Sequence, residues 1–254
     1  MAEKVWFITG TSRGFGREWA IAALERGDKV AATARDTASL DDLVAKYGDA
    51  ILPLKLDVND RAADFAAVNE AHDHFGRLDI VVNNMGGTMP RPLLDTSPRF
   101  LEEAFRFNVS AGHALIRAAV PRMLEGDDPG GAIVSISSVM GHVAGRGYVG
   151  YGTVKGALEQ YTRLASRDLA PRIRVNAIGV GSTATSALDI VMSSDELRTA
   201  MVDATPLRRL GHVDDIASAI LYLVSPAGAY VTGKIIEVDG GLQSPNLEFP
   251  LPDL

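Results

Sequence analysis

Short runs of strand-forming residues alternate with longer helical patterns, and this alternation limits the possible folds more than any other feature of the chain. Several strand runs are apolar on both faces, as strands buried in a parallel sheet are. Repeated strand–helix–strand units predict an α/β fold, with a seven-stranded parallel sheet and helices on both faces. The predicted strands are residues 5–9, 29–34, 51–56, 78–83, 132–137, 174–178 and 234–238, and the predicted helices are residues 14–26, 39–47, 61–75, 99–124, 151–169 and 213–223.

The composition fits one globular domain over residues 1–254, with 46% hydrophobic and 22% charged residues. The net charge of −7 argues against nucleic-acid or anionic-membrane partners. Cysteine is absent, which excludes disulfides, cysteine-ligated metals and thiol nucleophiles. No apolar run reaches the length of a membrane span, and the first residues have no signal-peptide pattern. We therefore expect a cytoplasmic protein.

A glycine-rich turn joins the first predicted strand to the first predicted helix. It comprises Thr9, Gly10, Thr11, Ser12, Arg13, Gly14, Phe15 and Gly16. Such glycines permit a tight turn and close approach of the backbone to a pyrophosphate, which then faces a helix N-terminus. The strand–turn–helix context favours a dinucleotide site over an ordinary glycine-rich turn. Gly10, Ser12, Arg13, Gly14, Phe15 and Gly16 are its candidate cofactor-binding residues.

Arg35 follows the second predicted strand, where the adenosine ribose of a dinucleotide binds. Together with Arg13 it offers two cations to a 2′-phosphate, which favours NADP(H). Asp36 could instead serve the ribose hydroxyls, so NAD(H) stays open.

Tyr151 and Lys155 are four residues apart in a predicted helix, with Ser138 thirteen residues before the tyrosine. Positions i and i+4 share one helix face, and an ammonium beside a phenol lowers the pKa of that phenol. A serine at a strand end could hold a substrate oxygen against the tyrosine. Taken singly, the pair could be a surface pair and Ser138 a strand-end cap.

These segments together resemble the short-chain dehydrogenase/reductase family, over almost the whole chain. The glycine turn resembles that family's TGxxxGxG, and Asn83, Asn84, Met85 and Gly86 resemble its NNAG. Asp57 and Val58 resemble its adenine-contacting pair, and Asn108, Ser138, Tyr151 and Lys155 its catalytic residues. Residues 173–178 with Gly181 and Thr185 resemble the segment beside the nicotinamide, and residues 206–211 and 238–241 resemble later framework signatures.

The resemblance implies a single Rossmann-type doubly wound domain and an NADP(H)-dependent oxidoreductase that interconverts a ketone or aldehyde and an alcohol by hydride transfer. Tyr151 would be the general acid or base, Lys155 would lower its pKa and bind the nicotinamide ribose, and Ser138 would polarise the carbonyl. Asn108 would hold a relay water through its backbone carbonyl, and Thr183 and Thr185 would orient the carboxamide. A homotetramer or homodimer would form through helices 99–124 and 151–169.

Two residues depart from the family pattern, Met85 in place of alanine and Val180 in place of proline. Met85 could crowd the cofactor, and Val180 adds backbone freedom to the following loop. These departures leave two alternatives open: a nucleotide-binding regulatory protein without turnover, and an isomerase or dehydratase that retains its cofactor.

The long loop at residues 179–206 is the predicted substrate loop, because open α/β sheets bind ligands at such loops. Its apolar stretch, residues 186–192, suggests a bulky or apolar substrate among small carbonyl compounds and alcohols, although the same residues could instead pack the helix of this loop. The back half resembles bacterial hydroxysteroid and alcohol dehydrogenases, and the front half a different branch, so a recombined or engineered chain is one hypothesis.

No metal site is expected. His72 and His74 are two positions apart in a predicted helix and do not share a face.

Overall fold

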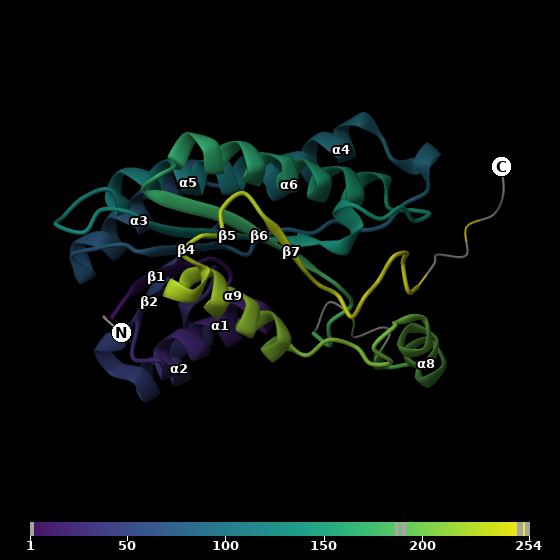
Figure 1. Ribbon diagram of the computed structural model, residues 1–254, viewed down its shortest axis with the longest axis horizontal. Helices are drawn as coiled ribbons and strands as arrows, with labels where there is room; N and C mark the ends of the chain where they lie inside the picture. The colour runs from purple at the N-terminus through teal and green to yellow at the C-terminus, as the bar shows by residue number, and fades with distance from the viewer. Residues whose placement is uncertain (1–2, 186–187, 189–191, 248–250, 252–254) are drawn as a thin grey trace.

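The computed structural model describes residues 3–185, 188, 192–247 and 251. A seven-stranded sheet lies at its centre, in the order β3-β2-β1-β4-β5-β6-β7, with all neighbouring strands parallel (Figure 1). The predicted fold class is confirmed. The strands are β1 Val5–Ile8, β2 Lys29–Ala34, β3 Ile51–Lys55, β4 Ile80–Asn83, β5 Gly131–Ser138, β6 Ile173–Val180 and β7 Ile235–Val238.

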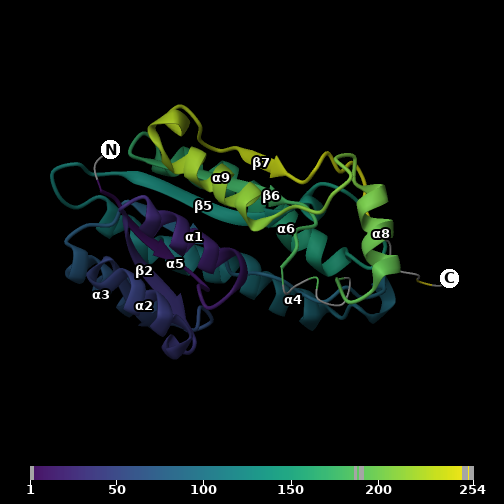
Figure 2. The same cartoon turned by 90° about the horizontal axis from the view of Figure 1, so that it is seen from below.

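Helices cover both faces of this sheet. In Figure 1, α1, α2 and α9 lie below the sheet and α3, α4, α5 and α6 lie above it, whereas α8 stands apart at the right in Figures 1 and 2. Among the described residues, no helix is both long and apolar enough to cross a lipid bilayer. The helices are α1 Gly14–Glu25, α2 Asp41–Tyr47, α3 Arg61–Phe75, α4 Pro98–Phe105, α5 Ala111–Met123, α6 Val149–Leu169, α8 Asp195–Ala204 and α9 Val213–Val224.

Alternate residues of β1 enter opposite halves of the core. Trp6 and Ile8 pack in one apolar cluster with residues of α1 and α9, and Val5 and Phe7 pack in another with residues of α3 and α5. Successive side chains of a strand point to opposite faces, so a central strand covered on both sides must be apolar throughout. Each large side chain buried in this way contributes roughly 1.5–3 kcal/mol to folding.

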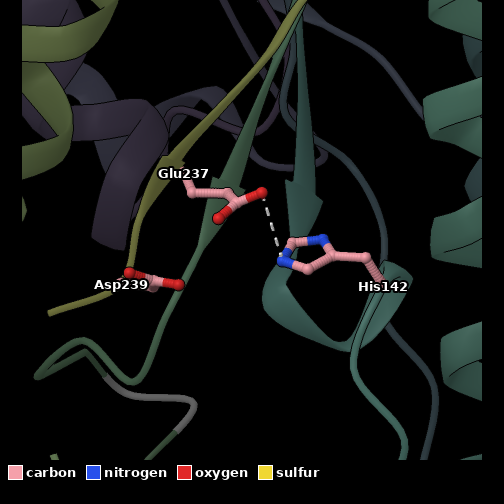
Figure 3. Close-up of side chains that lie close together, drawn as sticks. All are labelled: His142, Glu237 and Asp239. Carbon is pink, nitrogen blue, oxygen red and sulfur yellow. Dashed lines mark ion pairs between the residues drawn. The ribbon is translucent and has the colours of Figure 1, made fainter. Parts of the chain in front are cut away.

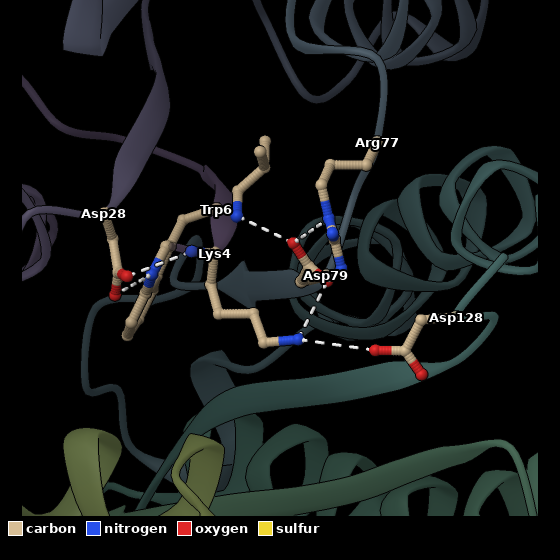
Figure 4. Close-up of polar contacts among 7 residues, drawn as sticks. Lys4, Trp6, Asp28, Arg77, Asp79 and Asp128 are labelled. Carbon is tan, nitrogen blue, oxygen red and sulfur yellow. Dashed lines mark hydrogen bonds and ion pairs between the residues drawn. The ribbon is translucent and has the colours of Figure 1, made fainter. Parts of the chain in front are cut away.

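Two buried carboxylates fix the amino end of the sheet (Figure 4). Asp79 accepts hydrogen bonds from the backbone N–H of Val5 at 2.8 Å and from Arg77 Nε at 2.9 Å. Asp28 accepts from the backbone N–H of Lys4 at 3.0 Å and from Trp6 Nε1 at 2.9 Å. These charge-assisted bonds tie β1 to the segments entering β2 and β4 at the edge opposite the predicted site.

Strand lengths differ across the middle of the sheet. The last residue of β4, Asn83, pairs with Ser135 of β5, but β5 continues for three more residues to Ser138, which pairs with Val180 of β6. The two long strands therefore project past the carboxyl end of β4.

The helix predicted at residues 99–124 is present, but it is not α-helical throughout. It consists of α4, a π-helical turn at Arg106–Ser110 and α5, with the N–H of Ala111 donating to the carbonyl of Arg106. Single π turns inside α-helices occur frequently at functional sites. Here the turn contains Asn108.

Candidate active site

The glycine-rich turn has the shape of an anion-binding cradle. Gly16 lies so close to the preceding backbone that a Cβ there would sit 2.3 Å from the carbonyl oxygen of Gly10. Helix α1 begins at Gly14, its N-cap residue Arg13 makes no side-chain capping bond, and its first turn has no acidic residue. The first N–H groups of α1 thus lack a side-chain acceptor and fit a pyrophosphate.

Asn84 and Met85 lie against this turn. Asn84 Nδ2 donates to the carbonyl oxygen of Thr9 at 2.9 Å, which fixes the end of β4 to the turn. A Cβ on Gly10 would lie 2.5 Å from Met85 Sδ. The thioether therefore rests on Gly10, and the glycine leaves room for it.

Asn108 has a structural role through its side chain. Its Oδ1 accepts from the N–H of Gly87 at 2.7 Å, and its Nδ2 donates to the carbonyls of Gly87 at 3.1 Å and Ala104 at 2.9 Å. A Cβ on Gly86 would lie 2.7 Å from both Asn108 Oδ1 and Lys155 Nζ. The segment after β4, the π turn and α6 therefore meet at Gly86.

The other three predicted catalytic side chains, those of Ser138, Tyr151 and Lys155, come from two elements. Ser138 ends β5, and its Oγ accepts from the N–H of Met140 at 3.3 Å, capping the short turn Val139–Gly141. Tyr151 lies near the start of α6, and the ammonium of Lys155 lies 5.7 Å from its ring centroid. Lys155 is buried, and its Nζ donates to the carbonyl oxygen of Ile136 at 2.9 Å.

Burial dominates the electrostatics of this group. It raises the pKa of Tyr151, while a hydrogen bond with Ser138 acts in the lowering direction. Burial also lowers the pKa of Lys155 to about 8. In the polypeptide alone, desolvation of the phenolate therefore outweighs the hydrogen bond with Ser138, and the lowering of the Tyr151 pKa by Lys155 stays a prediction.

Two exposed arginines lie where the adenosine phosphate was predicted. The N–H of Thr11 donates to the carbonyl of Thr33 at 2.8 Å, which joins the glycine-rich turn to β2. Arg13 lies two residues after Thr11, and Arg35 lies two residues after Thr33, so the two arginines follow neighbouring segments. Neither arginine forms an ion pair within the described part of the chain. The carboxylate of Asp36 accepts from the N–H of Ala38 at 3.1 Å, capping the turn Thr37–Leu40.

Asp57 and Val58, the pair predicted to contact adenine, lie just after β3. Val58 is buried, and Asp57 Oδ1 accepts from the N–H and Nδ2 of Asn59, both at 3.0 Å. These bonds, helped by the charges of Arg35 and Arg106, hold the pKa of Asp57 below its usual value.

The segment after β6 begins in a fixed geometry. Val180 is the last residue of β6 and pairs with both Ser138 and Val238, so its own backbone is held in the sheet. The backbone freedom expected of the following loop stays a prediction. Thr183 Oγ1 donates to the carbonyl of Gly181 at 3.2 Å, and the N–H of Ala184 donates to Gly211 at 3.0 Å. Of the apolar stretch at 186–192, residues 186–187 and 189–191 lie outside the described residues.

Two cavities open near these segments. One, of about 460 Å³, is lined by residues of α3 and the π turn, including Val58 and Arg106. The other, of about 420 Å³, lies between the end of β7 and the start of α9 and includes Thr183 and Asp239. The side chains of Ser138, Tyr151 and Lys155 line neither of them.

One cluster of possible metal ligands was not predicted. His142, Glu237 and Asp239 bring ligand atoms within 4.8 Å of one another among the described residues (Figure 3). Both ring nitrogens of His142 already face carboxylates, Glu159 at 3.3 Å and Glu237 at 3.6 Å. We interpret the cluster as an ion-pair network. No short sequence motif could predict it, because His142 and the two carboxylates are about a hundred positions apart.

Glu159 is a second residue that sequence reasoning missed. Positions 151, 155 and 159 share one helix face, and this spacing was the available signal. Its carboxylate is buried beside the turn that follows Ser138.

Comparison with known proteins places this geometry in a family. A family model described as enoyl-(acyl carrier protein) reductase matches residues 10–243. An uncharacterized oxidoreductase of Mycobacterium tuberculosis is 50% identical over 255 residues, covering 99% of this chain and 97% of that protein. The 3-oxoacyl-[acyl-carrier-protein] reductase of Staphylococcus aureus is 33% identical over 241 residues, covering 92% and 96%. The hypothesis of a recombined chain gains no support, because one relative spans both halves.

Solved structures agree. A 7α-hydroxysteroid dehydrogenase complexed with NADH and 7-oxo glycochenodeoxycholic acid superposes with a TM-score of 0.87 at 31% identity, covering 94% of this chain and 93% of that one. A short-chain dehydrogenase/reductase from Brucella melitensis gives a TM-score of 0.86 at 30% identity, covering 94% and 96%. The chain therefore belongs to the short-chain dehydrogenase/reductase family, oxidoreductases that act on CH–OH or keto groups with NAD(P).

Proposed function

We propose that the protein is an NADP(H)-dependent oxidoreductase that interconverts a small apolar ketone or aldehyde and the corresponding alcohol. The observation that carries this proposal is the grouping of Ser138, Tyr151 and Lys155 at the carboxyl end of a sheet whose first turn is an anion cradle. Two relatives support it by their names: a 3-oxoacyl-[acyl-carrier-protein] reductase and a 7α-hydroxysteroid dehydrogenase. Both names describe the interconversion of a ketone and an alcohol.

The residues present fit a bound nicotinamide dinucleotide. The N–H groups at the start of α1 would hold the pyrophosphate, Asp57 and Val58 the adenine, and Thr183 and Thr185 the carboxamide. When bound, the cofactor supplies or accepts the hydride. Asn84, Met85, Gly86 and Gly181 would line its path, with Met85 the residue that limits the space over Gly10.

Proton transfer would belong to the protein. In reduction, the Ser138 hydroxyl donates a hydrogen bond to the substrate oxygen, and the Tyr151 hydroxyl delivers the proton to that oxygen. In oxidation the same phenol accepts the proton. Lys155 would bind the nicotinamide ribose and stabilise the phenolate, and Asn108 would support a water at its backbone carbonyl.

Loss of the Tyr151 hydroxyl tests the chemistry. Tyr151→Phe should lower ketone-dependent NADPH oxidation at least 1,000-fold, roughly the scale of general acid–base catalysis, while the Kd for NADPH stays within about twofold. Absorbance at the nicotinamide band measures turnover, and fluorescence titration measures binding. Activity close to that of the wild type would sink the assignment.

A regulatory protein without turnover remains the second candidate, because Met85 rests on the glycine turn. Wild-type protein that binds NADPH and oxidises none of a broad ketone panel would favour it. Conversion of substrate with no net change in NADPH would instead favour an isomerase or dehydratase.

We propose a preference for NADP(H) over NAD(H) because Arg13 and Arg35 are both exposed beside the glycine-rich turn, whereas the Asp36 carboxylate caps the turn Thr37–Leu40. Arg35→Ser should raise the Kd for NADPH about 10- to 100-fold, since a hydrogen bond to a charged group contributes about 1.5–3 kcal/mol, and leave the Kd for NADH nearly unchanged. Arg172→Ser, a change at an exposed arginine before β6 and outside this site, is the control. Equal losses for both cofactors would contradict a phosphate contact.

Assembly into a homodimer or homotetramer is proposed through α4, α5 and α6, which lie side by side on one face (Figure 1). Phe105 on α4 and Leu164 on α6 are exposed there, at 43% and 58%. Exposed apolar side chains on adjoining helices are typical of interfaces between subunits.

A further inference from the structure

A buried glutamate lies one helical turn beyond Lys155 and outside the proton-transfer group. Only 4% of the Glu159 side chain is exposed. A carboxylate in such a place is costly unless hydrogen bonds satisfy its oxygens. The contacts of Glu159 therefore indicate what it holds.

Those contacts lie on both sides of Ser138 in the sequence. Ser137 Oγ lies 3.2 Å from Glu159 Oε1 and 3.4 Å from the backbone oxygen of Lys155. His142 Nδ1 lies 3.3 Å from the same Oε1. A carboxylate only accepts, so both groups donate to it, and the segment carrying Ser138 is tied to α6 at its two ends.

The turn between these ties is pressed onto the carboxylate. A Cβ on Gly141 would lie 2.4 Å from Glu159 Oε1, and a Cβ on Gly156 would lie 3.0 Å from the carbonyl oxygen of Gly141. Arg163, on the next turn of α6, places Nη2 3.8 Å from Glu159 Oε2. Glycines on both surfaces thus permit the approach, and an arginine faces the second oxygen.

We propose that Glu159 is a positioning residue that holds Ser138 against Tyr151. Both the tyrosine and the lysine lie on α6, whereas Ser138 lies on β5. Glu159 joins these elements beside Ser138, and the bond from Lys155 Nζ to the Ile136 carbonyl joins them on the strand side. The proposal rests on the proposed ketone–alcohol chemistry, in which Ser138 and Tyr151 must reach one substrate oxygen.

The first experiment compares Glu159→Ala with Glu159→Gln in the full chain. Removal of the acceptor should lower kcat about 10- to 100-fold, the scale expected when a catalytic group moves by about 1 Å, with the Kd for NADPH within about twofold of wild type. Glutamine keeps an acceptor oxygen and should restore kcat to within about threefold. Thr162→Val is the matched control, because it removes a buried hydrogen bond within α6, from Thr162 Oγ1 to the carbonyl oxygen of Leu158.

The second experiment asks whether Glu159 acts through Ser138. In a Ser138→Ala background, Glu159→Ala should lower kcat by less than about twofold, because the group it positions is gone. If Glu159→Ala only damaged the structure of α6, its effect on kcat would multiply with the effect of Ser138→Ala. If Glu159→Ala does not fold, Ser137→Ala carries the same comparison, because it removes a donor to the Glu159 carboxylate. It should lower kcat and lose that effect without Ser138.

Three results would overturn the proposal: unchanged kcat in Glu159→Ala, a weakening of NADPH binding equal to the loss of kcat, or multiplicative effects with Ser138→Ala. Wild-type protein without any turnover would instead overturn the proposed function, so the two failures are distinguishable.

Discussion

Asp64 on α3 is a carboxyl group with no exposed surface and no hydrogen-bond partner for either oxygen among the described residues. Burial, with smaller contributions from Asp60 and Asp57, raises its pKa to about 7. The unfolded value is about 3.9, so the folded state binds more protons between these values. Stability is therefore lost as pH rises from about 4 to about 7, and the cost is complete above 7.

Asp64→Asn should stabilise the protein at pH 8.5 by roughly 2–4 kcal/mol, because three pKa units correspond to about 4 kcal/mol at most, with a much smaller gain at pH 5. Denaturant unfolding at the two pH values measures the difference. Asp73→Asn, a change at an exposed aspartate of the same helix, should be neutral at both. An equal gain at both pH values would show that ionisation of Asp64 is not the cause.

The sequence motifs predicted which residues gather at the site, but not how each is used. Tyr151, Lys155 and Ser138 are readable from spacing, because helix period and strand order bring them together. The bond from Lys155 to Ile136 and the net direction of the Tyr151 pKa depend on burial, which one-dimensional spacing does not contain. Glu159 and Asp64 belong to no short motif. The spacing of Glu159 from Tyr151 and Lys155 indicates a shared helix face, but not that its carboxylate is buried.

At the level of elements, α5 and β4 approach closely through a glycine. A Cβ on Gly112 would lie 2.3 Å from Asn83 Nδ2. Gly112→Ala should therefore destabilise the protein by about 1–3 kcal/mol, the usual cost of overpacking, despite the better helix propensity of alanine. Thermal and denaturant unfolding measure the change, and Arg117→Ala on the exposed side of α5 should stay within about 0.5 kcal/mol. A stabilised Gly112→Ala would mean that α5 can move away from β4.

Strand and helix types were predictable because apolar runs differ in period and length. The π turn within residues 99–124 was not predictable, since the apolar pattern continues through it and the extra residue shifts the hydrogen bonds without changing composition. The side chain of Asn108 then reaches Gly87 instead of solvent.

At the level of the whole molecule, the proposed assembly depends on the face formed by α4, α5 and α6. Leu164→Glu should shift the protein to a smaller species in size-exclusion chromatography with light scattering. The variant would bury a carboxylate from each subunit in an apolar interface, which is costly. Phe65→Glu, at a 44% exposed residue of α3, is the control. A wild-type monomer, or an unchanged oligomer in Leu164→Glu, would contradict assembly through this face.

The difference in length between β4 and β5 sets how far Ser138 lies beyond the glycine-rich turn. Ser138 stands three residues past the position paired with the end of β4, about 10 Å at the rise of a parallel strand. Two residues added to β5 would carry the serine about 7 Å farther while keeping its face; one added residue would turn it to the opposite face. The reach of the reacting group beyond the cofactor cradle is thus set in whole peptide units, so substitutions can tune this site finely, whereas insertions in β5 can only misplace it.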